Sequence, residues 1–239
     1  PNIEAVSFVG STKVAKIVYI RATSNLKRCV ALGGAKNHLL VFPDANPEMT
    51  ASNVVASMSG CAGQRCMAAS VMVGVDKVQH IIDRMVHEAK AIVPGDNLGS
   101  VITAEAKDRI ESYIAEAEKN GAKILLDGRN ATVAGKEGGY YVGPTIIDYV
   151  TTDMSVAREE IFGPVISIIR AKDLDEAIAI ENGSNYGNAA AVFTESGGLA
   201  KQVMDRASAG MIGVNIGVPV PREPFSFGGW NHRDCDNCV

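Results

Sequence analysis

The sequence predicts an α/β fold on two observations. Short apolar runs rich in β-branched residues alternate with longer segments whose apolar residues recur every three or four positions. Turn-forming residues such as Gly33-Gly34 and Pro43-Asp44 separate many of these segments. The 239 residues are 46% hydrophobic and 21% charged, which supports a sizeable core and excludes disorder, collagen-like repeats and coiled coil.

The predicted strands are short, mostly β-branched runs that end at turn-forming residues. In chain order, they are expected at residues 5–9, 27–32, 38–42, 71–75, 123–127, 145–150, 165–170, 189–194 and 211–215.

The predicted helices carry apolar residues on one face. In the first helix Val14, Ile17 and Val18 share that face. Pro47 suits the first turn of the second helix, because the amide hydrogen that proline lacks would be unpaired there. In chain order, helices are expected at residues 12–24, 47–59, 77–91, 103–120, 174–182 and 198–207.

Composition narrows the classes of function. The 23 Lys and Arg residues against 27 Asp and Glu give a net charge of −4, and aromatic residues are 5% of the chain. Without a basic block or stacking residues, we expect no nucleic-acid partner. No apolar run approaches the roughly 18 residues of a membrane span, so no membrane partner is expected. Five cysteines without framework spacing favour a reducing compartment.

The two ends of the chain differ from its middle. Pro1 opens a stretch that already reads as the inside of a fold, with no charged or apolar leader pattern, so we expect a fragment without a visible signal peptide. Residues 231–239 are polar and contain His232, Cys235 and Cys238. Because a structural zinc site needs four ligands and no second cysteine pair follows, no metal site is predicted.

The strongest local signal for chemistry is the glycine-containing loop between Cys61 and Cys66. Backbone N–H groups of such a loop and the charge of Arg65 would favour the thiolate of Cys66 and could donate to an oxyanion. The alternative is that Cys66 is a small buried apolar residue. The four histidines show no ligand spacing and no pairing with a cysteine, which argues against a Cys-His hydrolase.

Two further motifs could bind a cofactor. Phe8-Val-Gly-Ser11 ends a strand at a helix N-terminus, where free N–H groups could hold a phosphate; an ordinary turn is the alternative. Glu159-Glu160-Ile-Phe162-Gly-Pro164 could place an acid on ribose hydroxyls with an aromatic ring beside it. The alternative for this motif is a solvated helix end.

Together these motifs resemble the aldehyde dehydrogenase superfamily, over nearly the whole chain up to about Trp230. The segments that carry the resemblance are Phe8-Val-Gly-Ser11, Leu32-Gly-Gly-Ala-Lys-Asn37, Gly63-Gln-Arg-Cys66, Glu160-Ile-Phe-Gly-Pro164, Asn185-Tyr-Gly187 and Pro224-Phe-Ser-Phe-Gly228. Gly34-Ala-Lys-Asn-His38 and Gly63-Gln-Arg-Cys-Met67 are similar to the CoA-acylating methylmalonate-semialdehyde dehydrogenase branch, as are Asn185-Tyr-Gly-Asn188 and Pro219-Val-Pro221.

The resemblance implies a fold and a division of the chain. Residues 1–34 would be the last piece of a Rossmann-type NAD-binding domain, and residues 35–215 a catalytic domain of three α/β layers. Residues 216–239 would be a truncated or altered tail where the family builds an oligomerisation arm. The parent protein would be a homotetramer or homodimer, in the mitochondrial matrix if eukaryotic and in the cytoplasm if bacterial.

The resemblance also implies roles for six residues. Cys66 would be the nucleophile that attacks the aldehyde, with its own N–H as one oxyanion donor. Arg65 would bind a substrate carboxylate as a fork; a structural ion pair is its alternative. The cofactor-binding residues would be Gly10 and Ser11 at the NAD pyrophosphate, Glu160 at the nicotinamide ribose and Phe162 against the cofactor.

One departure from the family points to CoA as a co-substrate. Hydrolytic members carry a glutamate as the general base where this sequence has Leu32. The implied reaction converts methylmalonate or malonate semialdehyde, NAD and CoA to propionyl-CoA or acetyl-CoA, CO2 and NADH.

The alternatives are a hydrolytic aldehyde dehydrogenase with another base and an inactive remnant. Because most of the cofactor half is absent, we expect the chain alone to be inactive.

Overall fold

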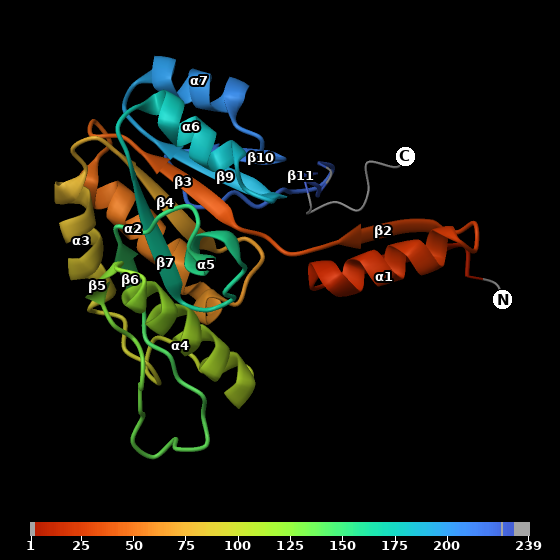
Figure 1. Cartoon of the computed structure of the whole chain (residues 1–239), viewed down its shortest axis with the longest axis horizontal. Helices are drawn as coiled ribbons and strands as arrows, with labels where there is room; N and C mark the ends of the chain where they lie inside the picture. The colour runs from red at the N-terminus through yellow and green to blue at the C-terminus, as the bar shows by residue number, and fades with distance from the viewer. Residues whose placement is uncertain (1–2, 226, 232–239) are drawn as a thin grey trace.

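The computed structural model describes residues 3–225 and 227–231. Its N-terminal unit consists of two parallel strands, β1 (Ala5–Val9) and β2 (Arg28–Leu32), joined by helix α1 (Thr12–Thr23). This unit projects from a larger α/β body, to which residues 33–36 connect it (Figure 1). The cysteines and histidine weighed as zinc ligands, Cys235, Cys238 and His232, lie outside the described residues.

The body is built on one seven-stranded sheet in the order β10-β9-β3-β4-β7-β6-β5. All neighbouring strands are parallel except β5, which is antiparallel to β6. The strands are β3 (Asn37–Val41), β4 (Ala69–Val75), β5 (Lys123–Leu126), β6 (Thr145–Asp148), β7 (Val165–Ala171), β9 (Ala189–Phe193) and β10 (Met211–Val214). Every residue of β3 and β9 is buried, because helices cover both faces of this part of the sheet.

Helices pack on both faces of the sheet and complete three layers. Alternating residues of β3 show this directly, since Leu39 and Val41 belong to the core under α2 (Pro47–Ser59) and α3 (Gln79–Ala89). Leu40 belongs to the core on the opposite face. The helices of that opposite face are α4 (Ala104–Lys119), α5 (Ser155–Arg158), α6 (Leu174–Asn182) and α7 (Gly197–Arg206).

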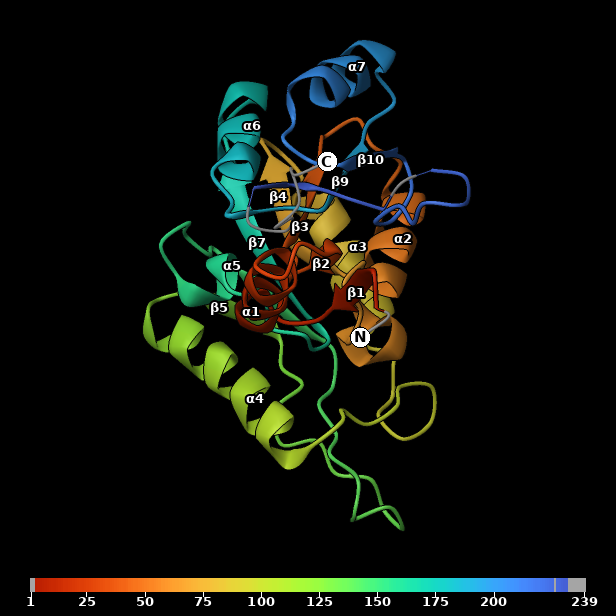
Figure 2. The same cartoon turned by 90° about the vertical axis from the view of Figure 1, so that its right-hand side faces the viewer.

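Figure 2 shows the N-terminal unit in front of the central strands.

Short polar side chains fix the starts of several helices. Asn46 accepts a hydrogen bond from the Met49 N–H at 3.0 Å, directly before Pro47 in the first turn of α2. Thr103 and Asp173 cap α4 and α6 in the same way. Each cap satisfies an amide that has no partner within the helix, so these helices begin where the sequence patterns place them.

The three-layer α/β prediction with a Rossmann-like portion is confirmed, and every strand and helix expected from the sequence is present within two residues at either end. The sequence patterns missed four short elements. These are α5, a 3-10 turn at Gly60–Gly63, and the antiparallel pair β8 (Tyr186–Gly187) and β11 (Trp230–Asn231). A single helical turn or a two-residue strand shows no periodicity, and such elements form through tertiary contacts. The domain limits 1–34, 35–215 and 216–239 remain predictions.

The described helices do not include one that is both long and apolar enough to cross a membrane.

Phe193 offers a test of the core between the sheet and the helices α2 and α3. It is 0% exposed, so we expect Phe193→Ala to lower the free energy of unfolding in urea by about 3–5 kcal/mol through lost burial and a cavity. Phe225 is 76% exposed, and Phe225→Ala is the matched control with an expected change within about 0.5 kcal/mol. Equal losses in the two variants would contradict this packing.

Candidate active site

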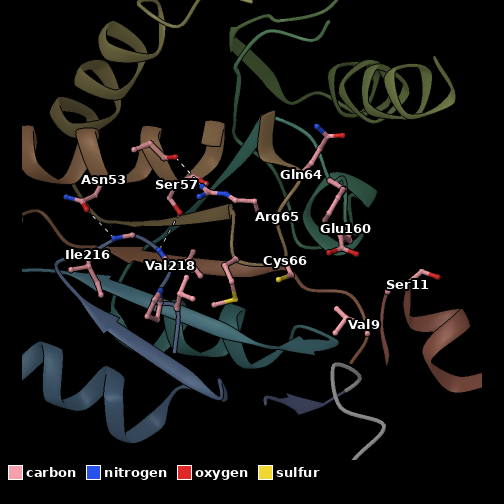
Figure 3. A pocket seen from close by; sticks show the side chains of 18 of the residues that line it. Val9, Ser11, Asn53, Ser57, Gln64, Arg65, Cys66, Glu160, Ile216 and Val218 are labelled. Carbon is pink, nitrogen blue, oxygen red and sulfur yellow. Dashed lines mark hydrogen bonds between the residues drawn. The ribbon is translucent and has the colours of Figure 1, made fainter. Parts of the chain in front are cut away.

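A cavity of about 1170 Å³ brings the six predicted site residues together. Figure 3 shows Ser11, Arg65, Cys66 and Glu160 in its wall. Its wall is formed by the N-terminal unit, the end of α2, the loop that follows α2, the segment around Glu160 and the chain after β10. The six predicted residues that line it are Gly10, Ser11, Arg65, Cys66, Glu160 and Phe162. Segments far apart in the sequence therefore meet as the motifs predict, while the roles assigned to these residues remain predictions.

The cavity lies between two sets of strand ends. Gly10 and Gly33 follow β1 and β2, so the N-terminal unit contributes the carboxyl ends of its strands. Cys66 precedes β4 and Glu160 precedes β7, so the body contributes the amino ends of adjacent parallel strands. The carboxyl ends of parallel strands are the usual ligand-binding edge, and this edge of the N-terminal unit faces the cavity.

A close backbone approach positions the loop that carries Cys66. The loop begins with left-handed backbone at Cys61, Ala62 and Gly63, whose φ angles are 53°, 54° and 67°. A Cβ on Gly63 would lie 2.0 Å from the carbonyl oxygen of Gly163. Only glycine permits this contact, which packs the cysteine loop against the turn before β7.

Two asparagines hold the backbone at Cys66. Asn37 donates its side-chain amide to the carbonyl oxygens of Cys66 and Ala68, both at 2.8 Å. Asn188 donates to the same Cys66 oxygen at 3.1 Å. Both asparagines lie within motifs of the sequence, but their role could not be predicted, because nothing local shows that they converge on one carbonyl.

Arg65 is exposed and bonds to backbone carbonyls at the end of α2. It donates to the oxygen of Ser57 at 2.9 Å and to that of Ala56 at 3.4 Å. The guanidinium packs over Gly60, where a Cβ would lie 2.5 Å from Nη2. The sequence-based alternative, an ion pair with a carboxylate, is not found within residues 3–225 and 227–231, because helix carbonyls take that place.

Glu160 is held by the connection between the two parts of the chain. Its Oε1 accepts a hydrogen bond from the Ala35 N–H at 3.1 Å. A Cβ on Gly34 would lie 2.7 Å from Oε2, so the absence of a side chain there leaves room for the carboxylate. Arg109 fixes the neighbouring backbone by donating to the Ile161 carbonyl at 2.6 Å. Phe162 follows with a φ of 55° and is 40% exposed at the cavity.

The turn at Gly10 and Ser11 presents the N-terminus of α1 to the cavity. Gly10 donates to the carbonyl of Leu32 at 3.1 Å, which joins the ends of the two strands. Ser11 is the N-cap residue, and its side chain makes no capping hydrogen bond. The first amides of α1 thus remain available to an anion.

No carboxylate comes from the end of β2. Ala31 and Leu32 are both apolar and buried, and among the described residues that line the cavity Glu160 is the single acid. Neither side chain can accept a proton, so Ala31, like Leu32, cannot act as a general base.

Two basic residues are buried where the N-terminal unit joins the body: Lys36 ends the connection of residues 33–36, and His38 is the second residue of β3. Burial lowers the pKa of Lys36 to about 7, against the opposing attraction of Glu160 and then Glu159. Burial, followed by the charge of Lys36, lowers the pKa of His38 to about 4. Residues 3–225 and 227–231 contain no group of three or more His, Cys, Asp or Glu side chains that could hold a metal ion.

Fold and cavity together define a class: a three-layer α/β protein whose cysteine-centred pocket lies against a Rossmann-like βαβ unit. The sequence matches the aldehyde dehydrogenase family over residues 1–233, and the chain belongs to that family. The predicted membership is thereby confirmed.

Relatives and solved structures agree with this assignment. Malonate-semialdehyde dehydrogenase 2 of Bacillus thuringiensis is 46% identical over 235 residues, which are 95% of this chain and 48% of the relative. A Sinorhizobium meliloti structure described as a methylmalonate-semialdehyde dehydrogenase complexed with NAD is 41% identical with a TM-score of 0.95, covering 98% of this chain and 49% of that one. The corresponding enzyme of Oceanimonas doudoroffii is 39% identical with a TM-score of 0.95, covering 98% and 50%. The chain spans about half the length of the curated relatives it matches.

Gly63 tests whether the close backbone approach positions Cys66. In Gly63→Ala the new methyl group meets the Gly163 carbonyl, so we expect a loss of roughly 2–4 kcal/mol of unfolding free energy. The opened loop should also raise the rate at which iodoacetamide labels half-buried Cys66, towards that of exposed Cys61. Gly99→Ala is the control, because a Cβ there meets no atom within 4 Å. Unchanged labelling and stability in Gly63→Ala would refute the role of this contact.

Proposed function

We propose that this chain is the catalytic part of an NAD-dependent semialdehyde dehydrogenase that works through a thioester on Cys66. The observation that carries the proposal is the single cavity lined by Cys66, Glu160 and the N-terminal turn of α1. The family membership and the semialdehyde dehydrogenases among the relatives support it.

In the proposed mechanism Cys66 attacks the carbonyl carbon of the aldehyde. A new C–S bond forms, the carbonyl π pair moves to oxygen, and the Cys66 N–H is one donor to that oxygen. The aldehyde carbon then loses its hydrogen as hydride, the C=O bond re-forms, and the acyl group remains on sulfur as a thioester. Asn37 and Asn188 hold the Cys66 backbone in place for both steps.

The residues at the cavity fit NAD. The free amides at the start of α1 suit a pyrophosphate, and the Glu160 carboxylate, anchored by Ala35, suits a pair of ribose hydroxyls. When bound, NAD supplies the hydride acceptor for the oxidation. Among the solved relatives, the Sinorhizobium meliloti structure was determined with NAD.

Arg65 supports a substrate with its own carboxylate. Arg65 lines the same cavity as Cys66, and its hydrogen bonds to the carbonyls of Ser57 and Ala56 use only part of its five N–H donors. A fork of the remaining donors would hold a carboxylate one carbon away from the reacting aldehyde. Malonate or methylmalonate semialdehyde fits this description, and loss of CO2 would follow formation of the acyl-enzyme.

The absence of a carboxylate at the end of β2 supports CoA as the acyl acceptor. A thiolate attacks a thioester without the general base that water requires, so apolar Ala31 and Leu32 favour release as propionyl-CoA or acetyl-CoA. A hydrolytic enzyme is the second candidate, and Glu160 would then be its base because it is the single acid among the described lining residues. The bacterial relatives favour the cytoplasmic alternative for the whole protein.

Cys66 and Cys61 provide the central experiment. The protein is produced with any flanking segments that its gene encodes, incubated with malonate semialdehyde and NAD, and analysed by peptide mass spectrometry. We expect an acyl adduct on Cys66. Without CoA, NADH formation should stop after a single turnover of the enzyme, and with CoA it should continue. Cys66→Ser should abolish the adduct and reduce turnover by at least about 10³-fold, since the hydroxyl is a far weaker nucleophile.

Cys61→Ser is the matched control and should retain turnover, because Cys61 does not line the cavity. Full NADH turnover without CoA would favour the hydrolytic candidate. An adduct on another residue would refute the mechanism.

Arg65 tests substrate choice. Arg65→Gln should raise KM for malonate semialdehyde by about 10–100-fold, because a charge-assisted bidentate contact is lost. The KM for propanal, which has no carboxylate, should stay within about threefold. Thermal unfolding of the wild type and of Arg65→Gln measures how much stability is lost with the Arg65 contacts to α2. Equal increases for the two aldehydes would indicate that Arg65 acts only through the structure of the loop.

A further inference from the structure

Lys36 is a buried cation that the proposed mechanism leaves unused. It is 2% exposed, and its Nζ makes no hydrogen bond within the described part of the chain. An ammonium group in this position loses its hydration without gaining a direct partner, so folding alone would favour an apolar side chain.

The neighbours of Lys36 in the chain hold the two reactive parts of the cavity. Ala35 donates its backbone N–H to the Glu160 carboxylate at 3.1 Å. Asn37, on the other side, donates its side chain to the Cys66 carbonyl at 2.8 Å. Lys36 is therefore fixed between the anchor of the carboxylate and the anchor of the nucleophile.

A small space lies among these groups. It measures about 10 Å³ and is lined by Lys36, Cys66 and Glu160 among others. That volume accommodates at most about one water molecule and no larger anion. Any negative charge that compensates Lys36 must therefore belong to the protein.

Carboxylates of the segment before β7 supply that charge. Glu160 and then Glu159 favour the ammonium form, and against them burial brings the pKa of Lys36 to about 7. Of the other ionisable groups, Arg65 and Cys66 line the same space, and His38 is neutral near pH 7 because its pKa is about 4. Glu160 is thus the principal partner of the Lys36 charge.

We propose that Lys36 is a positioning residue for the cofactor carboxylate: its ammonium holds Glu160 as an anion in the cavity beside Cys66, and loss of the Lys36 proton weakens that hold. The role of Glu160 at the ribose rests on the proposed function, whereas the coupling of Lys36 to Glu160 does not. A purely structural lysine would affect stability without linking its proton to the charge at residue 160.

The first experiment measures this coupling by NMR titration of 13Cε-labelled lysines in the protein with any flanking segments its gene encodes. The Lys36 resonance, identified by its loss in Lys36→Met, should titrate near pH 7. In Glu160→Gln the midpoint should fall by about one pH unit, because the larger attraction is removed. Glu159→Gln is the matched control with a smaller decrease. A midpoint near 10, or one insensitive to Glu160→Gln, overturns the proposal.

The second experiment separates this proposal from the proposed function. The Kd for NAD is measured from pH 6 to pH 9 in the wild type and in Lys36→Met. We expect roughly tenfold weaker binding in the wild type once Lys36 is neutral, and weak binding without this pH step in Lys36→Met. The same pH step in both proteins overturns the positioning role. Coupling seen by NMR in a protein that binds no NAD would support the Lys36–Glu160 link and refute the proposed cofactor.

Discussion

The contact between the backbones at Gly63 and Gly163 is the constraint on which the site depends. It brings the loop before β4 against the turn before β7, with no space for a side chain on Gly63. Gly163 is enclosed as well, since a Cβ there would lie 2.7 Å from Ile110 of α4. Cys66 and Glu160 line one cavity because the segments that carry them are stacked in this way, and because β4 and β7 are adjacent in the sheet.

The sequence predicted those parts of the fold that depend on local patterns. Alternating apolar runs and a proline in a first turn act through neighbours a few positions away, so they can be recognised without a structure. The pair β8 and β11 exists only because two distant segments meet. Its two-residue strands carry no pattern of their own.

The same distinction applies to the site. The motifs indicated Cys66, Arg65 and Glu160, because cysteine beside arginine and paired acids before Gly-Pro stand out locally. The burial of Lys36 depends on the packing of the connection before β3 against the segments that carry Cys66 and Glu160, and has no local signal. The bonds from Arg65 to α2 likewise depend on where the helix ends relative to the loop.

The short connection between β2 and β3 fixes the N-terminal unit relative to the segment before β7. Residues 33–36 are all buried, although they join two separate parts of the chain. Gly34 donates its N–H to Thr12 of α1 at 3.0 Å, while Ala35 binds Glu160. One connection thus bonds to the N-terminal unit and to the segment before β7. A shift of the unit that carries Gly10 and Ser11 would have to break these bonds, so the turn at Gly10 and Ser11 is placed relative to Glu160 by the same few residues.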